Sequence, residues 1–234
     1  MSKDFLQTKQ TVLAGAAIFA LAVPAALSSP DPDWPPVQAA HYADFGDATP
    51  SFDARSVADW IADSNDAGGG PFVIVDKKQA RLYVFDADSH LRASSAVLLG
   101  AARGDKSLPG SISRPIDLLR REERITPAGR FVASRGRNLR GEDIVWVAYD
   151  ESVSMHRVLT AYPKERRLER LSTPTPDDNR ISYGCINLPA AFYEAHIRPM
   201  FASHDAVVYV LPEAGTVQQV FGAYNVAASH LMAN

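Results

Sequence analysis

Hydrophobic residues first recur at helical spacing along the chain and then change to a two-residue alternation. Residues 52–61 place apolar side chains on one helix face, with Ser51 and Asp53 as candidate N-caps, and three glycines at 68–70 end the segment. From residue 71 the alternation is typical of β-strands. The predicted strands cover residues 72–75, 80–85, 94–100, 143–149, 152–159 and 206–211. The pattern therefore predicts a mostly β domain with a few short helices.

Three segments depart from this alternation. Residues 101–124 read as an irregular, partly charged insertion. The connection 159–180 is long for a compact domain, which is common in functional loops, and we expect a short helix in it with Leu168 and Leu171 facing inward. Residues 213–234 predict an amphipathic C-terminal helix, either packed on the domain or presented to a partner.

The N-terminus has the pattern of a targeting segment. Residues 12–27 are almost entirely apolar, follow two lysines, and end at a small-residue site before Ser29. Residues 1–29 are therefore predicted to be a signal peptide or a membrane anchor, and either one places the domain in the periplasm or cell envelope. A proline-rich tether and the first helix fill 30–70. The predicted catalytic domain covers 71–212, and the C-terminal extension covers 213–234.

Composition agrees with one globular domain and excludes one class of partner. Of the 234 residues, 46% are hydrophobic and 22% are charged, which is enough apolar material for a core. The net charge of −3, without a long run of one sign, gives no electrostatic basis for nucleic-acid binding. The composition does not define an oligomeric state.

The only cysteine of the chain, Cys185, lies between small and polar residues. A lone thiol in an exported protein has no intramolecular disulfide partner, which suggests either reactivity or pairing with another chain. Its setting among small and polar residues favours the reactive role. Gly184 permits a close backbone approach, and Pro189 suits the first turn of a helix predicted from residue 190. We therefore expect the thiol just ahead of a helix N-terminus, where the helix dipole favours a thiolate.

The segment from Ser182 to Asn187, Ser-Tyr-Gly-Cys-Ile-Asn, resembles the Ser/Thr-His-Gly-Cys-x-Asn/Arg signature of L,D-transpeptidase catalytic domains. The strands of 72–100 and the Thr-Pro-Ala-Gly-Arg-Phe segment at 126–131 are also similar to that family. The resemblance implies an L,D-transpeptidase-like β-sandwich or barrel. It further implies acyl transfer between peptidoglycan stem peptides through a cysteine thioester, with no cofactor.

A cysteine nucleophile needs a base, and His156 is the predicted one among six histidines. It stands at the end of a strand that precedes the cysteine turn, and the resemblance implies the same role. The family usually has glycine at the next position, where this chain has Arg157. This leaves a backbone carbonyl to orient the imidazole.

Tyr183 is the main departure from the family, which has histidine there. A tyrosine, with a reference pKa near 10, can donate a hydrogen bond but is not an acid or base at neutral pH. We predict that Tyr183 and the backbone around Gly184 serve the oxyanion, with Ser182, Asn187 and Arg157 as substrate-binding residues. The arginines of the long connection (Arg166, Arg167 and Arg170) either meet substrate carboxylates or form a solvated, ion-paired loop.

The sequence contains no motif for metal-dependent chemistry. Scattered histidines with one cysteine give no metal-ligand spacing, so no metal or cofactor is predicted. Two alternatives to transpeptidation stay open at this point. One is hydrolysis, with water as the acceptor, as in a carboxypeptidase or amidase. The other is a catalytically inactive module that binds the cell wall.

Overall fold

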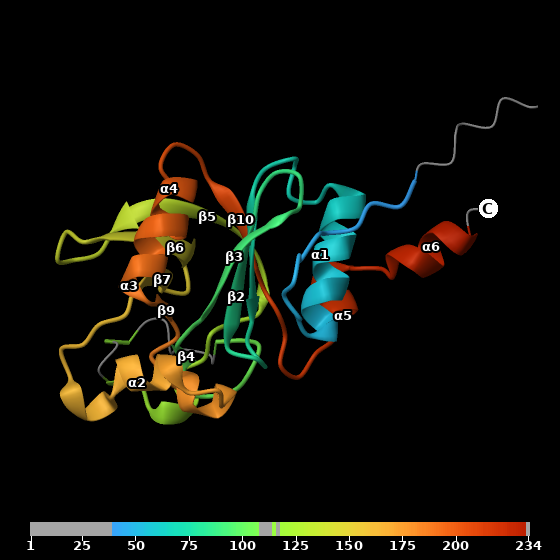
Figure 1. Ribbon diagram of the computed structural model, residues 1–234. Coiled ribbons are helices and arrows are strands. Elements are labelled where there is room, and N and C mark those ends of the chain that lie inside the picture. Colours follow the sequence, from blue (N-terminus) through green and yellow to red (C-terminus); the bar gives the residue numbers. More distant parts are fainter. Residues whose placement is uncertain (1–38, 108–113, 116–117, 233–234) are drawn as a thin grey trace, which may run out of the picture. The chain divides into compact units, whose positions relative to one another are not determined.

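A single sheet of eight strands organises the fold, in the order β3-β2-β1-β10-β5-β6-β7-β9 (Figure 1). The computed structural model describes residues 39–107, 114–115 and 118–232, so the predicted targeting segment 1–29 lies outside the described residues. The strands of the sheet are β1 Phe72–Asp76, β2 Arg81–Phe85, β3 Leu91–Ala96, β5 Gly129–Arg137, β6 Asp143–Ala148, β7 Val153–Arg157, β9 Ile186–Leu188 and β10 Ala206–Val210. A separate parallel pair consists of β4 (Leu99–Gly100) and β8 (Arg180–Ser182).

The helices are short apart from the first. They are α1 Phe52–Ser64, α2 Arg167–Ser172, α3 Ala190–Phe192, α4 Arg198–Met200, α5 Val217–Phe221 and α6 Val226–Met232. A π-helical turn, η5 (Tyr193–Ile197), joins α3 to α4, and 3₁₀ turns occur at η2 Arg121–Glu123, η3 Pro163–Glu165 and η4 Pro176–Asn179. The Ser51 hydroxyl caps α1 by accepting a hydrogen bond from the Ala54 N–H at 3.1 Å, as predicted. The prediction of a mostly β fold with a few short helices is confirmed.

The sheet curls until its two edges nearly meet. Directly after β3, Leu98 exchanges two backbone hydrogen bonds of 2.9 Å with Asn187 of β9, the strand at the opposite edge. This bridge joins β9 to the segment that follows β3 and leaves less unpaired backbone on β9 for contact with another chain. It also places Asn187, a candidate site residue, at the closure of the barrel.

Both faces of the central strands are buried, against different partners. Alternate residues of β1, such as Val73 and Val75, pack in a core with the helical segment 190–200. The intervening residues, Phe72 and Ile74, pack in a second core with α1. In Figure 1, α1 lies on one side of β2 and β3, whereas α3 and α4 lie on the other. The described residues belong to one compact unit, Val37–Asn234, so the predicted boundaries at 71 and 212 fall inside it.

Two predicted helical features differ in the structure. The C-terminal segment forms two helices, because Gly222 adopts φ 73° and ends α5 with a left-handed cap. In the long connection Leu168 is 60% exposed, and Arg167 is buried in its place. Within the described residues, no helix has the length and apolarity needed to span a bilayer.

Candidate active site

Two neighbouring parallel strands assemble the residues around the cysteine. His156 on β7 is opposite Asn187 on β9, and Met155 is opposite Ile186. Because side chains alternate along a strand, Ser154 and His156 share one face of β7, and Cys185 and Asn187 share the same face of the β9 segment. Met155 and Ile186 point the other way, into the core that packs with the helical segment 190–200, which we call the inner core. The alternation thus separates a polar face, which carries the predicted nucleophile and base, from a buried apolar face.

The His156 ring is held at both nitrogens. Nδ1 lies 2.7 Å from the Arg157 carbonyl oxygen, and Nε2 lies 3.2 Å from the Asn187 amide nitrogen. A carbonyl oxygen only accepts, so Nδ1 carries the hydrogen of the neutral ring. This is the backbone-carbonyl orientation that the presence of Arg157 instead of glycine led us to expect.

The Cys185 thiol is half-buried and surrounded by hydrogen-bonding groups. Its sulfur lies 3.5 Å from Ser154 Oγ and 3.8 Å from the Ser152 carbonyl oxygen. Burial by itself raises the pKa of the thiol, but interactions with His156 and Ser154 outweigh it, and the pKa is lowered from its ordinary value. For His156, burial lowers the pKa, whereas the hydrogen bond and charge of Cys185 raise it to a net increase. Each group therefore favours the charged form of the other.

Hydrogen bonds of the Ser182 and Thr126 hydroxyls fix the turn that presents Cys185. The Ser182 hydroxyl donates to the Cys185 carbonyl oxygen at 2.6 Å and accepts the Gly184 N–H at 3.1 Å. The Thr126 hydroxyl donates to the Gly184 carbonyl oxygen at 2.8 Å. Gly184 has φ 131°, and a Cβ there would lie 2.8 Å from the Ile125 carbonyl oxygen, so only glycine fits. Ser182, predicted to bind substrate, thus acts within the turn.

The helical segment predicted from residue 190 begins there, but it does not adjoin the cysteine turn. β9 follows Cys185 directly, and the helical segment begins only at Ala190. The expectation that a helix dipole activates the thiol is therefore wrong, because residues 186–188 continue as a strand paired with β7. The polarising groups are instead the side chains of His156 and Ser154.

Cys185 opens into a cavity of about 420 Å³. Its wall includes the apolar side chains of Leu119, Leu139, Ile144 and Trp146, together with Tyr183. A smaller cavity of about 300 Å³ adjoins it at Ile144 and is lined by His156, Arg157, Asp143 and Glu142. Cys185 and His156 therefore line two adjoining cavities, and an extended ligand that occupies both would contact both side chains.

Tyr183 lines the cysteine cavity, and the Arg124 guanidinium lies over its ring at 3.9 Å from the centroid. Such a cation–π contact holds the ring in place. The role of the Tyr183 hydroxyl as an oxyanion donor stays a prediction. The Gly184 N–H, also predicted to serve the oxyanion, is engaged with Ser182.

Arg157 was predicted to bind substrate, and the structure places its guanidinium among protein groups. It donates to Asp143 Oδ1 at 3.1 Å, pairs with Glu194, and lies 4.4 Å from the centroid of the Tyr193 ring. These contacts tie β7 to β6 and to the helical segment. Substrate binding by Arg157 stays a prediction.

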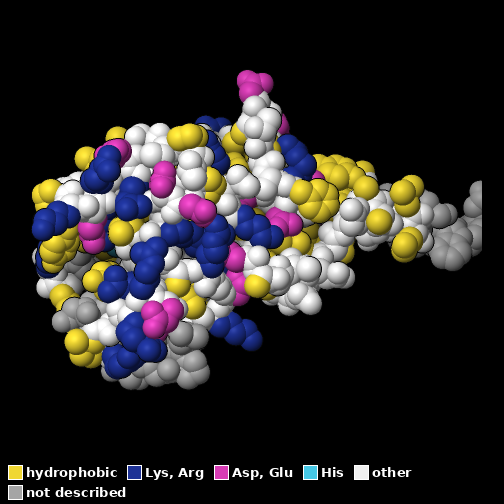
Figure 2. Space-filling model, turned by 90° about the horizontal axis from the view of Figure 1, so that it is seen from below, with side chains coloured by type: hydrophobic (Ala, Val, Ile, Leu, Met, Phe, Trp, Pro, Cys, Tyr) yellow, Lys and Arg dark blue, Asp and Glu magenta, His cyan; other side chains and the backbone are white. Residues whose placement is uncertain are grey.

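The arginines of the long connection are engaged within the protein. Arg166 pairs with Glu169, and Arg170 donates to the backbone oxygens of Glu165 and Asp178. Arg167 reaches the site itself and donates to Asn187 Oδ1 at 2.6 Å. Figure 2 views the molecule from below, the side where α2 lies in Figure 1, and shows basic side chains with acidic ones among them. This fits the ion-paired alternative for the loop, with Arg167 as the exception.

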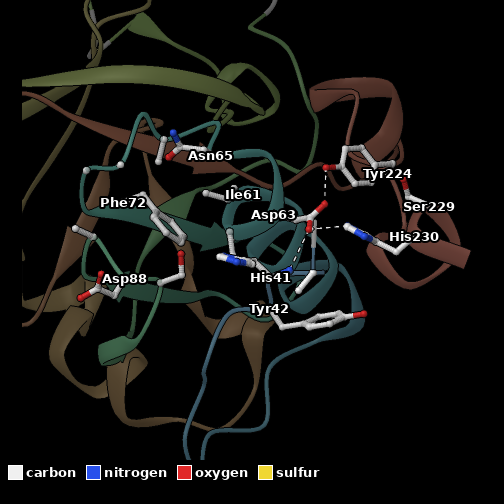
Figure 3. A pocket seen from close by; sticks show the side chains of 17 residues that line it. His41, Tyr42, Ile61, Asp63, Asn65, Phe72, Asp88, Tyr224, Ser229 and His230 are labelled. Atoms are coloured by element: carbon white, nitrogen blue, oxygen red, sulfur yellow. Dashed lines mark hydrogen bonds and ion pairs between the residues drawn. The ribbon is translucent and has the colours of Figure 1, made fainter. Parts of the chain in front are cut away.

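A larger cavity lies elsewhere, between α1 and the α6 segment (Figure 3). Its volume is about 660 Å³, and Asp63 is its central polar group. The Asp63 carboxylate accepts hydrogen bonds from the His41 N–H at 3.0 Å and the Tyr224 hydroxyl at 2.7 Å, and His230 Nε2 lies 2.9 Å from it. These contacts connect α1 to the segments at both ends of the described chain. The only cysteine lies in the other cavity, which makes that one the candidate active site.

Among the described residues, Asp86, Asp88 and His90 lie close enough together to share a metal ion. They stand on the turn between β2 and β3. Asp86 Oδ1 already accepts the backbone N–H groups of Asp88 and His90, at 3.1 and 2.9 Å. This cluster is a hydrogen-bonded turn and contributes nothing to the lining of the cysteine cavity.

Comparisons with known proteins find similarity only at the level of structure. No protein-family model matches the chain, and no curated protein sequence matches it significantly. Among solved structures, the helical cell shape determining protein Pgp2 from Campylobacter jejuni aligns at 17% identity and TM-score 0.42, over 67% of this chain and 55% of that one. This chain thus spans little more than half the length of Pgp2.

Two further solved structures are L,D-transpeptidases. An enzyme from Mycobacterium tuberculosis aligns at 16% identity and TM-score 0.37, over 60% of this chain and 57% of its own. The catalytic domain from E. faecium aligns at 13% identity and TM-score 0.33, over 61% of this chain and 98% of its own.

Proposed function

We propose that this chain is an exported cysteine acyltransferase that acts on peptidoglycan stem peptides through a Cys185 thioester. The observation that carries the proposal is the placement of Cys185, just before β9, and His156 of β7 on one face of the sheet, where they interact beside a cavity. The thiol is the nucleophile, and the imidazole, held at Nδ1 by a carbonyl oxygen, is the base. The Ser-Tyr-Gly-Cys-Ile-Asn motif supplies the substrate class, and residues 12–27 support export.

The first half of the reaction acylates the enzyme. His156 Nε2 accepts the thiol proton, and the Cys185 sulfur forms a bond to the carbonyl carbon of the donor peptide. The tetrahedral adduct then collapses with cleavage of the carbon–nitrogen bond. The imidazolium returns its proton to the departing amine, and a thioester to Cys185 remains.

The second half transfers the acyl group. An amine of a second stem peptide attacks the thioester carbonyl and loses a proton to His156. The carbon–sulfur bond breaks, a new amide forms, and the imidazolium reprotonates the Cys185 thiolate. Backbone N–H of Cys185 and the Tyr183 hydroxyl are the groups that we assign to the oxyanion, and loss of one such donor typically costs about 2.7–4 kcal/mol in barrier.

Intact-mass measurement after incubation with a carbapenem tests the proposal. We expect a mass increase equal to one carbapenem molecule on the wild-type chain and none on Cys185→Ala. His156→Gln should acylate about 10²-fold more slowly, because a general base contributes about 10²–10⁴-fold. A folded wild-type protein that forms no adduct, or an adduct that persists in Cys185→Ala, would contradict the proposal and favour an inactive wall-binding module.

Product analysis separates transfer from hydrolysis. With a donor tetrapeptide and an added amine acceptor, a transpeptidase yields the cross-linked amide. A carboxypeptidase or amidase yields the same hydrolysed product whether or not the amine is present. We expect the amide to be the main product at saturating amine.

A further inference from the structure

Arg167 is the buried residue of the long connection between β7 and β8. Its side chain is 8% exposed, whereas the adjacent Leu168 is 60% exposed. It lies at the start of α2 and donates from Nε to Glu165 Oε2 and from Nη1 to Asn187 Oδ1, each at 2.6 Å. A buried guanidinium needs such partners, and one of them is a site residue.

The contact with Arg167 determines which way the Asn187 amide faces. Guanidinium groups only donate, so the amide oxygen must face Arg167 and the amide nitrogen must face the other side. On that side Asn187 Nδ2 lies 3.2 Å from His156 Nε2. The amide nitrogen also only donates, so Nε2 must accept and carries no hydrogen.

The same ring is constrained at its other nitrogen. His156 Nδ1 lies 2.7 Å from the Arg157 carbonyl oxygen, which requires a hydrogen on Nδ1. Both constraints select one state of the ring, the neutral tautomer with its lone pair on Nε2.

We propose that Arg167 is a positioning residue that acts through Asn187 to keep His156 in this neutral, base-ready tautomer. The proposal rests on the proposed function only in taking Cys185 and His156 as the reacting pair. The long connection would then serve the site, because it brings the Arg167 guanidinium to the Asn187 amide, which in turn contacts the imidazole.

The proposal predicts a definite direction of change. The Arg167 cation opposes protonation of the nearby imidazole. Without it, the Asn187 amide can turn its oxygen toward a protonated Nε2, which favours imidazolium and, beside it, the Cys185 thiolate. The other charged groups near His156 are Arg157, Asp143 and Glu142 of the adjoining cavity, and a change at Arg167 leaves all three in place.

The test is the pH dependence of Cys185 alkylation by iodoacetamide in the full chain, which needs no substrate. Arg167→Met should lower the midpoint of the alkylation profile by about one pH unit. Arg167→Lys, which keeps the charge and a donor, should restore most of the wild-type midpoint. The matched control is Arg170→Met on the same helix, since Arg170 bonds only the backbone oxygens of Glu165 and Asp178, and its midpoint should stay at the wild-type value.

Opposite results overturn the proposal. An unchanged midpoint in Arg167→Met, an equal shift in Arg170→Met, or a shift to higher pH would each do so, the last because it would mean that Arg167 stabilises the thiolate directly. If Arg167→Met does not fold by circular dichroism, Asn187→Asp tests the same point. It keeps the shape but presents an acceptor to Nε2, so its midpoint should also fall, and an unchanged midpoint would refute the inference.

The two proposals can fail separately. A chain that forms no carbapenem adduct but shows the Arg167→Met shift loses the proposed function and keeps the positioning role. A chain that forms the adduct, with an unchanged Arg167→Met profile, keeps the proposed function and loses the positioning role.

Discussion

At the scale of single residues, the reactivity of Cys185 depends on compensation for burial. The buried environment raises the pKa of the thiol, and contacts with His156 and Ser154 reverse the direction. The partners are neutral or conditionally charged, so the effect depends on the protonation of His156. The pH profile of the thiol therefore reports on the imidazole.

Replacement of His156 should raise the pKa of Cys185, because the effect of burial on the thiol would no longer be opposed by the imidazole. In His156→Gln we expect the midpoint of iodoacetamide alkylation to move from below the ordinary thiol pKa of 9.0 to that value or above it. Alkylation at neutral pH should then slow by about tenfold or more. The control is His196→Gln, which changes a histidine of the helical segment 190–200 and should leave the profile unaltered. Equal profiles for wild type and His156→Gln would mean that the two side chains do not interact.

Gly184 is the residue of the turn whose backbone angle and close neighbour both favour glycine. Its φ of 131° is strained for residues with a Cβ, and that Cβ would lie 2.8 Å from the Ile125 carbonyl oxygen. We expect Gly184→Ala to lower the free energy of unfolding by about 1–3 kcal/mol and to slow acylation, because the turn moves.

A second glycine separates backbone strain from the clash. Gly222 also has a positive φ, of 73°, but no atom lies within 4 Å of its would-be Cβ. Gly222→Ala should cost only about 1–2 kcal/mol and leave acylation unchanged. Urea denaturation and adduct formation measure both variants. Full activity in Gly184→Ala would contradict the proposed role of the turn.

At the scale of elements, period-two patterns located most strands. The predicted segments at 72–75, 80–85, 143–149, 152–159 and 206–211 each overlap one observed strand, whereas 94–100 spans the end of β3 and the whole of β4. Three strands lie outside the predicted ranges. β8 and β9 have three residues each, which is too few for a period, and the long strand β5, which begins within the segment 126–131, has no predicted range of its own. The pairing of β8 and β9 depends on β4 and β7, which are distant in sequence.

In the candidate site, too, some residues could be predicted from the sequence and others could not. The cysteine, its turn and His156 could be predicted, because motif and spacing are local properties of the sequence. Arg167 could not be assigned, because its burial depends on the Asn187 amide across the fold. A spacing rule for apolar residues placed Leu168 inward, and it fails where a buried polar group needs a donor. The one sequence signal for Arg167 was its place in an unusually long connection.

Lys77, in the turn between β1 and β2, is another buried polar residue. It is fully buried, and its ammonium lies 3.0 Å from Asp105 Oδ1. Asp105 also accepts the backbone N–H groups of residues 213–215, at 2.6, 2.9 and 3.0 Å. One carboxylate therefore joins the β1–β2 turn to the chain after β10.

Neutralising this carboxylate should destabilise the protein in a pH-dependent way. Burial raises the pKa of Asp105, but its backbone donors and Lys77 outweigh this and hold the pKa well below its ordinary 3.8. A depressed pKa contributes stability above the ordinary value, and this stability is lost as pH falls through the folded-state pKa. At pH 7 Asp105→Asn should cost on the order of 3 kcal/mol, because Lys77 loses its closest carboxylate.

The sign of the pH effect provides the check. Below about pH 4 the free energies of unfolding of wild type and Asp105→Asn should begin to converge, because the carboxylate of the unfolded wild-type chain takes up a proton there while the folded protein still holds it ionised. Urea denaturation at a series of pH values measures this. The control Asp88→Asn changes an exposed carboxylate and should track wild type throughout. A constant gap between wild type and Asp105→Asn at all pH values would refute the assignment.

At the scale of the whole described unit, one sheet separates two hydrophobic cores, the inner core with the helical segment 190–200 and the outer core with α1. The inner core packs under β7 and β9 and supports the face that carries Cys185 and His156. The outer core joins the sheet to α1, where Trp60 lies edge-on to Tyr209 and stacks with Phe221 of α5. The outer core thus unites segments that precede and follow the predicted catalytic domain. We infer that the sheet is stable only with both of them.

Truncation tests that inference. A chain that begins at residue 71 leaves Phe72, Phe85 and Tyr209 without α1, exposing an apolar face that is now buried. Compared with a chain that begins at residue 39, it should lose on the order of 5 kcal/mol of unfolding free energy, a large part of what a domain has. Trp60→Ala in the longer chain should cost about 3–5 kcal/mol by the same contacts. If urea denaturation finds the two truncated chains equally stable, the catalytic domain begins at residue 71, as the sequence pattern predicted, and α1 is an addition to it.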